Sequence, residues 1–157
     1  MITMQTPARI AMLSLMSFTA NAGDIAQYNV VWDSPSKDPS GTMPLGNGDI
    51  GLNAWVEPTG DLNFFISKTD AWDDNSRLCK VGKVRVTLDP APPVSPFQQT
   101  LELASGMMAV EYGDGTRLRL WVDANHPVLH VAASGPKPFT ATAYHRGKLV
   151  PATHADL

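Results

Sequence analysis

The chain of 157 residues has little cysteine, little excess charge and no long apolar run. Its single cysteine, Cys79, excludes an intramolecular disulfide, so stability must come from packing. The formal net charge of −3 at pH 7 gives no electrostatic basis for binding nucleic acid or an anionic membrane. No apolar run reaches the roughly 20 residues that a bilayer-spanning helix needs. We therefore expect neither a nucleic-acid partner nor a membrane partner.

Catalytic motifs are equally scarce. The sequence has no G-x-S-x-G elbow and no serine with a recognisable partner, which leaves a nucleophilic triad without support. His126 and His130 are four residues apart, about 13 Å along a strand, which is too far for one metal ion.

A sugar-cleaving carboxylate pair or a calcium site would have to come from loop acids. The commoner role of such residues is to cap turns. The candidates for the carboxylate pair are Asp49, Asp70, Asp73 and Asp74, and those for the calcium ligands are Asp70, Asp73, Asp74 and Asn75. We predict no catalytic residue, no metal and no cofactor in this chain.

The first 22 residues read as a cleavable signal peptide. Arg9 supplies a positive charge, residues 10–18 form a short apolar run, and Ala20-Asn21-Ala22 offers the small-x-small pattern of a cleavage site. Cleavage after Ala22 would leave 11 basic and 15 acidic residues, because Arg9 is the only charged residue removed. We expect a periplasmic or extracellular protein.

The remainder alternates in the manner of β-strands and shows no sustained helical periodicity. Apolar residues alternate with polar ones in two clear runs, which contain Val84, Val86 and Leu88, and Leu118, Leu120 and Val122. About nine short runs of this kind, separated by turn signals, predict an all-β fold, an antiparallel β-sandwich over residues 23–145. Residues 146–157 lose the pattern and are expected to be an irregular tail or a truncation end.

The glycines of Pro44–Gly51 spell G-x-G-x-x-G, the spacing of a dinucleotide-binding loop. That motif works only where a helix leaves the loop and points its N-terminus at a pyrophosphate. Here residues 52–57 lead into the turn Pro58-Thr59-Gly60-Asp61, and a second β-like run follows. The segment therefore predicts a loop that begins a β-hairpin and not a nucleotide site.

Three features together resemble a known family: Trp32, the segment Pro-Leu-Gly-Asn-Gly-Asp-Ile-Gly at 44–51, and Ser-Lys-Thr-Asp-Ala-Trp at 67–72. They are similar to the N-terminal β-sandwich domain of glycoside hydrolase family 95-like proteins, and most closely to the family catalogued as domain of unknown function 5703. The resemblance implies that a loop faces a neighbouring catalytic (α/α)6 barrel. The residues it implicates at a ligand or domain interface are Asn47, Gly48, Asp49, Asp70 and Trp72.

In that family the acid and base of glycoside cleavage lie in the barrel, which this chain is too short to contain. The resemblance thus implies a non-catalytic domain of an exported glycoside hydrolase-like protein, inactive alone, with the barrel and an oligo- or polysaccharide as expected partners. A stand-alone carbohydrate-binding module and a truncated, inactive fragment are the alternatives. For Trp72, stacking on a sugar and packing beneath its own loop both remain open.

Overall fold

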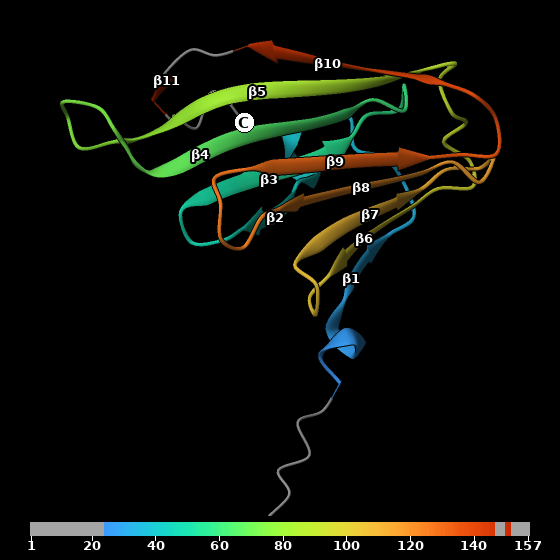
Figure 1. The fold of residues 1–157 in the computed structure, drawn as a ribbon, viewed down its shortest axis with the longest axis horizontal. Helices are drawn as coiled ribbons and strands as arrows, with labels where there is room; N and C mark the ends of the chain where they lie inside the picture. Colours follow the sequence, from blue (N-terminus) through green and yellow to red (C-terminus); the bar gives the residue numbers. More distant parts are fainter. Residues whose placement is uncertain (1–23, 147–149, 152–157) are drawn as a thin grey trace, which may run out of the picture.

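The protein is a sandwich of two antiparallel β-sheets, seen in a computed structural model that describes residues 24–146 and 150–151 (Figure 1). The predicted all-β antiparallel sandwich is confirmed. Eleven strands and two short 3-10 segments make up the described part of the chain, η1 (Ile25–Tyr28) and η2 (Pro39–Gly41) being the 3-10 segments. No helix in that part is long and apolar enough to cross a membrane.

The first sheet has five strands, each paired antiparallel with its neighbour. Their spatial order is β1 (Val30–Trp32), β6 (Gln98–Glu102), β7 (Met107–Glu111), β8 (Arg117–Val122) and β9 (Leu129–Ser134). The chain passes between the two sheets three times, after β1, β5 and β9.

The second sheet has six strands. Their order is β10 (Thr140–Arg146), β5 (Leu78–Asp89), β4 (Leu62–Trp72), β3 (Ile50–Val56) and β2 (Met43–Gly46), with β11 (Val150–Pro151) also paired to β5. The β4–β5 hairpin is the longest in the molecule, and its tip extends beyond the other loops at the left of Figure 1.

Strand alternation decides which side chains enter the space between the sheets. On β8, Leu118 and Leu120 are fully buried, whereas Arg117 and Arg119 are exposed, as the sequence pattern predicts. The second sheet contributes the same kind of apolar face. The fully buried aliphatic residues include Met43, Ala54, Val56 and Leu62 from one sheet and Met108, Val110, Leu118 and Leu120 from the other.

A buried side-chain hydrogen bond joins the two sheets at one end. The Tyr112 hydroxyl, which follows β7, donates to the carbonyl oxygen of Gly60 in the β3–β4 turn at 2.9 Å. Burial raises the pKa of this phenol above its usual range, so it stays protonated and able to donate. Gly60 has φ +88°, a conformation that a residue with a Cβ rarely adopts, so this acceptor depends on glycine.

Two segments that were expected to lie in loops belong to strands. The polar stretch after Ser67 continues β4 to Trp72, because β5 pairs with it again at Leu78, so the predicted loop is reduced to residues 73–77. Met43–Gly46 is a strand despite its proline and glycine. Pro44 is tolerated because β2 is the edge of its sheet.

The termini carry the remaining domain predictions. The predicted signal peptide, residues 1–22, lies outside the described residues. Strand β10 ends at Arg146, and β11 falls within the segment that was expected to be irregular. Residues 152–157 again lie outside the described part of the chain.

Replacing Leu120 by alanine should destabilise the domain by about 2 to 5 kcal/mol, because the side chain is fully buried and its removal leaves a cavity. Urea unfolding followed by tryptophan fluorescence measures the change. Leu103→Ala is the matched control, because Leu103 is 38% exposed. Equal unfolding midpoints for the two variants would contradict the assigned core.

Tyr112→Phe should lower the free energy of unfolding by about 1 to 3 kcal/mol, because it leaves the buried Gly60 carbonyl without its donor. The same urea titration applies. Tyr28→Phe makes the identical chemical change at a side chain that is 67% exposed, and should be neutral. A neutral Tyr112→Phe would mean that the cross-sheet bond contributes nothing.

Candidate functional site

One end of the sandwich, which we call the rim, carries all five residues that the sequence singled out. It consists of the β2–β3 loop (residues 47–49), the end of β4 with the hairpin tip 73–77, and the β8–β9 loop (123–128). These three segments lie at the same end of the molecule (Figure 1).

The β2–β3 loop is held in one shape by Asn47. The side-chain oxygen of Asn47 accepts from the backbone N–H groups of Asp49 at 3.0 Å and Ile50 at 2.9 Å. The backbone N–H of Asn47 donates to the Ile50 carbonyl at 3.2 Å. Gly48 adopts φ +92° although a Cβ there would touch nothing within 4 Å. Glycine is thus required at position 48 by backbone conformation and not by lack of space.

The same asparagine also reaches the other sheet. Its amide nitrogen donates to the carbonyl oxygen of Asp123 in the β8–β9 loop at 2.8 Å. Both ends of the Asn47 amide are therefore engaged, one within its loop and one across the sandwich. The pair is 76 residues apart in sequence, and no local pattern indicates it.

Asp49 and Asp70 share one cation that sequence reasoning missed. The Lys68 ammonium lies 3.1 Å from Asp49 Oδ1 and 2.7 Å from Asp70 Oδ2. The Thr69 hydroxyl also donates to Asp49 Oδ1, at 3.2 Å. The hydrogen bond between Lys68 and Asp70 is the main cause of two shifts. It lowers the pKa of Asp70 and raises the pKa of Lys68.

This ion cluster is solvent-exposed, with side-chain exposures of 37% for Lys68, 48% for Asp49 and 73% for Asp70. Exposed ion pairs of this kind add little to stability. Their effect is to present two carboxyl groups around one ammonium group at a fixed position beside the β2–β3 loop.

Trp72 lies at the end of β4. The sequence predicted a loop at this position, and that prediction is wrong. Its indole N–H donates to the Thr69 carbonyl at 2.6 Å, which fixes the ring, yet the residue is 57% exposed. Its cross-strand partner Leu78 is 38% exposed, and Val128 in the β8–β9 loop is 44% exposed. The rim therefore adds oriented apolar surface to its charged cluster.

Asp73 caps the turn at the hairpin tip. The Asp73 carboxylate accepts from the backbone N–H groups of Asn75 and Arg77 and lies 2.7 Å from the Arg77 guanidinium. The backbone N–H of Arg77 is the first cause of the lowered pKa of Asp73. In the residues described here, no group of three or more histidine, cysteine or acidic side chains is arranged to hold a metal ion.

The β8–β9 loop brings together two histidines that the sequence placed apart. His126 lies in the loop with Nδ1 3.0 Å from Asp123 Oδ1, and His130 on β9 has Nε2 3.6 Å from Asp123 Oδ2. Hydrogen bonds lower the pKa of Asp123 to about 2. The backbone N–H of Asn125 makes the largest contribution, and the His126 side chain makes the next largest. The estimate of 13 Å assumes that both histidines lie on one extended strand. Because His126 lies in the loop instead, both side chains reach the Asp123 carboxylate.

Trp55 and Trp121 serve sheet packing. Trp121 stacks on His130 at 4.8 Å between ring centroids, and the buried Trp55 contacts Phe65 at 5.3 Å with the Lys83 ammonium 5.0 Å above its ring. Trp72, on the rim, is thus more exposed to solvent than Trp55 or Trp121.

Comparison with known proteins identifies the family. A family model described as domain of unknown function (DUF5703), in its N-terminal form, matches residues 31–147, which is most of the sandwich. No curated protein and no solved structure matches the chain. The extent of that match shows that this chain belongs to the DUF5703 N-terminal domain family.

Proposed function

We propose that this domain is the non-catalytic N-terminal β-sandwich of an exported glycoside hydrolase-like protein. In this proposal the rim docks on a catalytic (α/α)6 barrel and helps to shape the cleft in which carbohydrate is processed. The observation that carries it is the rim itself, where an immobilised, exposed Trp72 stands beside a loop locked by Asn47.

An interface role is supported by the kind of surface found there. Trp72, Leu78 and Val128 expose apolar side chains at the same end of the sandwich. Tryptophan is among the residues that most often dominate the free energy of association, and polar groups around it commonly fix orientation. The Asp49–Lys68–Asp70 cluster supplies those polar groups.

The absence of catalysis by this chain is supported by the state of the rim acids. Glycoside cleavage generally needs one carboxylic acid that keeps its proton near neutral pH, which requires a raised pKa. Asp70 and Asp73 are shifted in the opposite direction, by Lys68 and by the Arg77 backbone and side chain respectively. Neither shift favours a role as the proton donor.

The preformed geometry supports docking without rearrangement. Asn47 fixes the loop through three hydrogen bonds, two to its side-chain oxygen and one from its side-chain nitrogen. A loop that is already ordered loses little conformational entropy when a partner binds. The rim would thus meet the barrel in the shape described above.

The exported chain should bind a glycoside hydrolase family 95-type (α/α)6 barrel, and Trp72→Ala should weaken that binding about tenfold, the usual scale for a central tryptophan. Titration calorimetry measures both affinities. Tyr28→Ala is the control, because Tyr28 is a 67% exposed aromatic residue away from the rim. No binding, or equal losses in the two variants, would contradict the proposal.

The chain alone should not hydrolyse aryl glycosides between about pH 4 and pH 8, since a general acid needs a raised pKa and the pKa values of Asp70, Asp73 and Asp123 are lowered. Release of nitrophenol from a broad panel of aryl glycosides is the measurement. Activity that disappears in Asp49→Asn or Asp70→Asn, with unchanged thermal unfolding, would show that the chain is an enzyme itself.

A further inference from the structure

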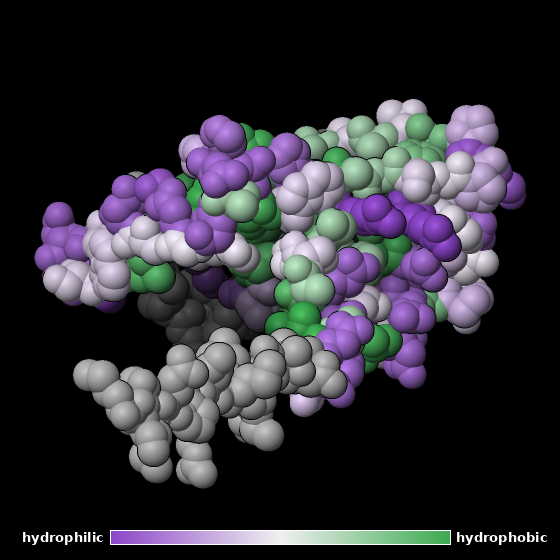
Figure 2. Space-filling view, turned by 60° about the horizontal axis from the view of Figure 1, so that its bottom comes forward, coloured by the Kyte–Doolittle hydropathy of each residue, from purple (hydrophilic) through white to green (hydrophobic). Residues whose placement is uncertain are grey.

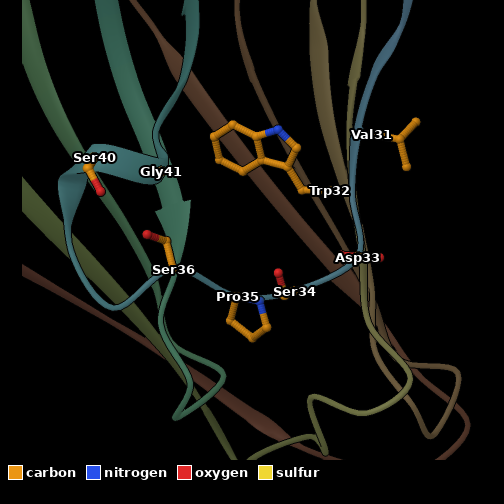
Figure 3. Close-up of a pocket in the computed structure, with 8 residues that line it drawn as sticks. All are labelled: Val31, Trp32, Asp33, Ser34, Pro35, Ser36, Ser40 and Gly41. Atoms are coloured by element: carbon orange, nitrogen blue, oxygen red, sulfur yellow. The ribbon is translucent and has the colours of Figure 1, made fainter.

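A second concave site lies away from the rim, between β1 and η2. The chain leaves β1 at Trp32, curls through residues 33–41 and returns to β2, enclosing an open pocket of about 490 Å³ (Figure 3). Small-molecule sites in proteins commonly have volumes of this order. No residue of the pocket belongs to the rim.

The wall of the pocket is the indole of Trp32. The ring projects from β1 across the hollow toward Gly41, while Val31 points to the opposite side of the strand (Figure 3). Trp32 is half-buried and packs partly against the core, so its position is set by the sandwich. A Cβ on Gly41 would lie 3.4 Å from Trp32 Cζ3 and 2.4 Å from Ser36 Oγ, so the absence of a side chain keeps the hollow open.

The facing loop is ordered by hydrogen bonds of its own. The Ser36 N–H donates to the Val56 carbonyl at 2.9 Å, which fastens the loop to the end of β3. The Ser40 N–H donates to Asp38 Oδ1 at 2.8 Å and begins η2. The pocket is therefore present before any ligand arrives.

Three serine hydroxyls line the pocket beside the ring. Those of Ser36 and Ser40 donate to the Asp38 carbonyl and the Asp38 carboxylate respectively, which leaves their oxygens free to accept. The Ser34 hydroxyl has no hydrogen-bond partner among residues 24–146 and 150–151, so it can both donate and accept. One carboxylate, Asp33, and no cationic side chain complete the polar lining.

This lining favours an uncharged, hydroxyl-rich ligand. An anion would meet Asp33 and no cation, and an ammonium group, although it could pair with Asp33 and with the serine oxygens, has no acceptor for the Ser34 hydroxyl. A sugar ring instead presents C–H groups to an aromatic face and hydroxyls at its edge, which can pair with Ser34, Ser36 and Ser40. We propose that the pocket between β1 and η2 binds one neutral pyranose residue of a glycan, stacked on Trp32.

The pocket does not depend on the proposed role of the rim. The two sites lie at opposite ends of β3, since Val56 anchors the pocket loop whereas Ile50 anchors the rim loop. A sugar bound at Trp32 could be recognised whether or not a barrel docks on Asn47 and Trp72.

The test is titration of the exported chain with neutral mono- and oligosaccharides built from glucose, galactose, xylose, fucose and N-acetylglucosamine. Saturation-transfer NMR detects the bound sugar, and calorimetry measures its affinity. We expect Trp32→Ala to weaken binding about tenfold or more, and Trp32→Phe to retain most of it, because phenylalanine keeps an aromatic face.

Two further variants separate lost contacts from lost folding. Ser34→Ala removes an exposed hydroxyl that has no internal partner in the described structure, so affinity should fall about threefold or more, as expected for one lost hydrogen bond, with an unchanged melting temperature. Gly41→Ala places a methyl group against Ser36 and Trp32 and should abolish binding.

Tyr28→Ala is the control, because it removes an exposed aromatic residue that belongs neither to the pocket nor to the rim, and it should bind the sugars normally. The proposal is overturned if no sugar in the panel binds, or if Tyr28→Ala loses binding that Trp32→Ala keeps. It is also overturned if lysine or choline binds the pocket as tightly as the sugars. None of these results bears on association with a barrel, which is measured separately.

Discussion

The burial of apolar side chains between the two sheets is the interaction on which the rest of the molecule depends. With a single, buried cysteine, the chain has no disulfide to hold its layers together. Residues such as Leu62 on one sheet and Leu120 on the other must do so by packing. Hydrogen bonds from Tyr112 at one end and from Asn47 at the other join loops of the two layers, so each end of the sandwich has a defined shape.

That packing explains why the class of fold was predictable. Alternation on β5 and β8 is visible in the sequence because one face of each strand enters the core and the other meets water. The segment from Lys68 to Trp72 was harder, because its polar composition disfavours a strand. Pairing with β5 near Leu78 overrides that local preference, and such pairing cannot be seen within a short window.

In the candidate sites too, short sequence patterns indicate local turns but not contacts between distant segments. The glycines around Asn47 indicated a tight loop, and the loop is there. The contact of Asn47 with Asp123, the bridging position of Lys68 and the approach of His126 and His130 to the Asp123 carboxylate all arise from register and loop reversal. The pocket at Trp32 was missed for a similar reason: its serines and prolines look like any surface loop until the strand beside them is placed. Figure 2 shows apolar groups scattered among polar ones on the face displayed.

The side-chain amide of Asn47 both holds its own loop and contacts the other sheet, and this restricts changes in the length of the β2–β3 loop. An insertion or deletion in the β2–β3 loop would move the amide relative to its own backbone partners and to the Asp123 carbonyl at once. The hairpin tip at residues 73–77 has no such double attachment in the part of the chain described: its capping bonds begin and end within the turn. Length variation among relatives should therefore accumulate at the hairpin tip, while the loop at Asn47 keeps a constant number of residues.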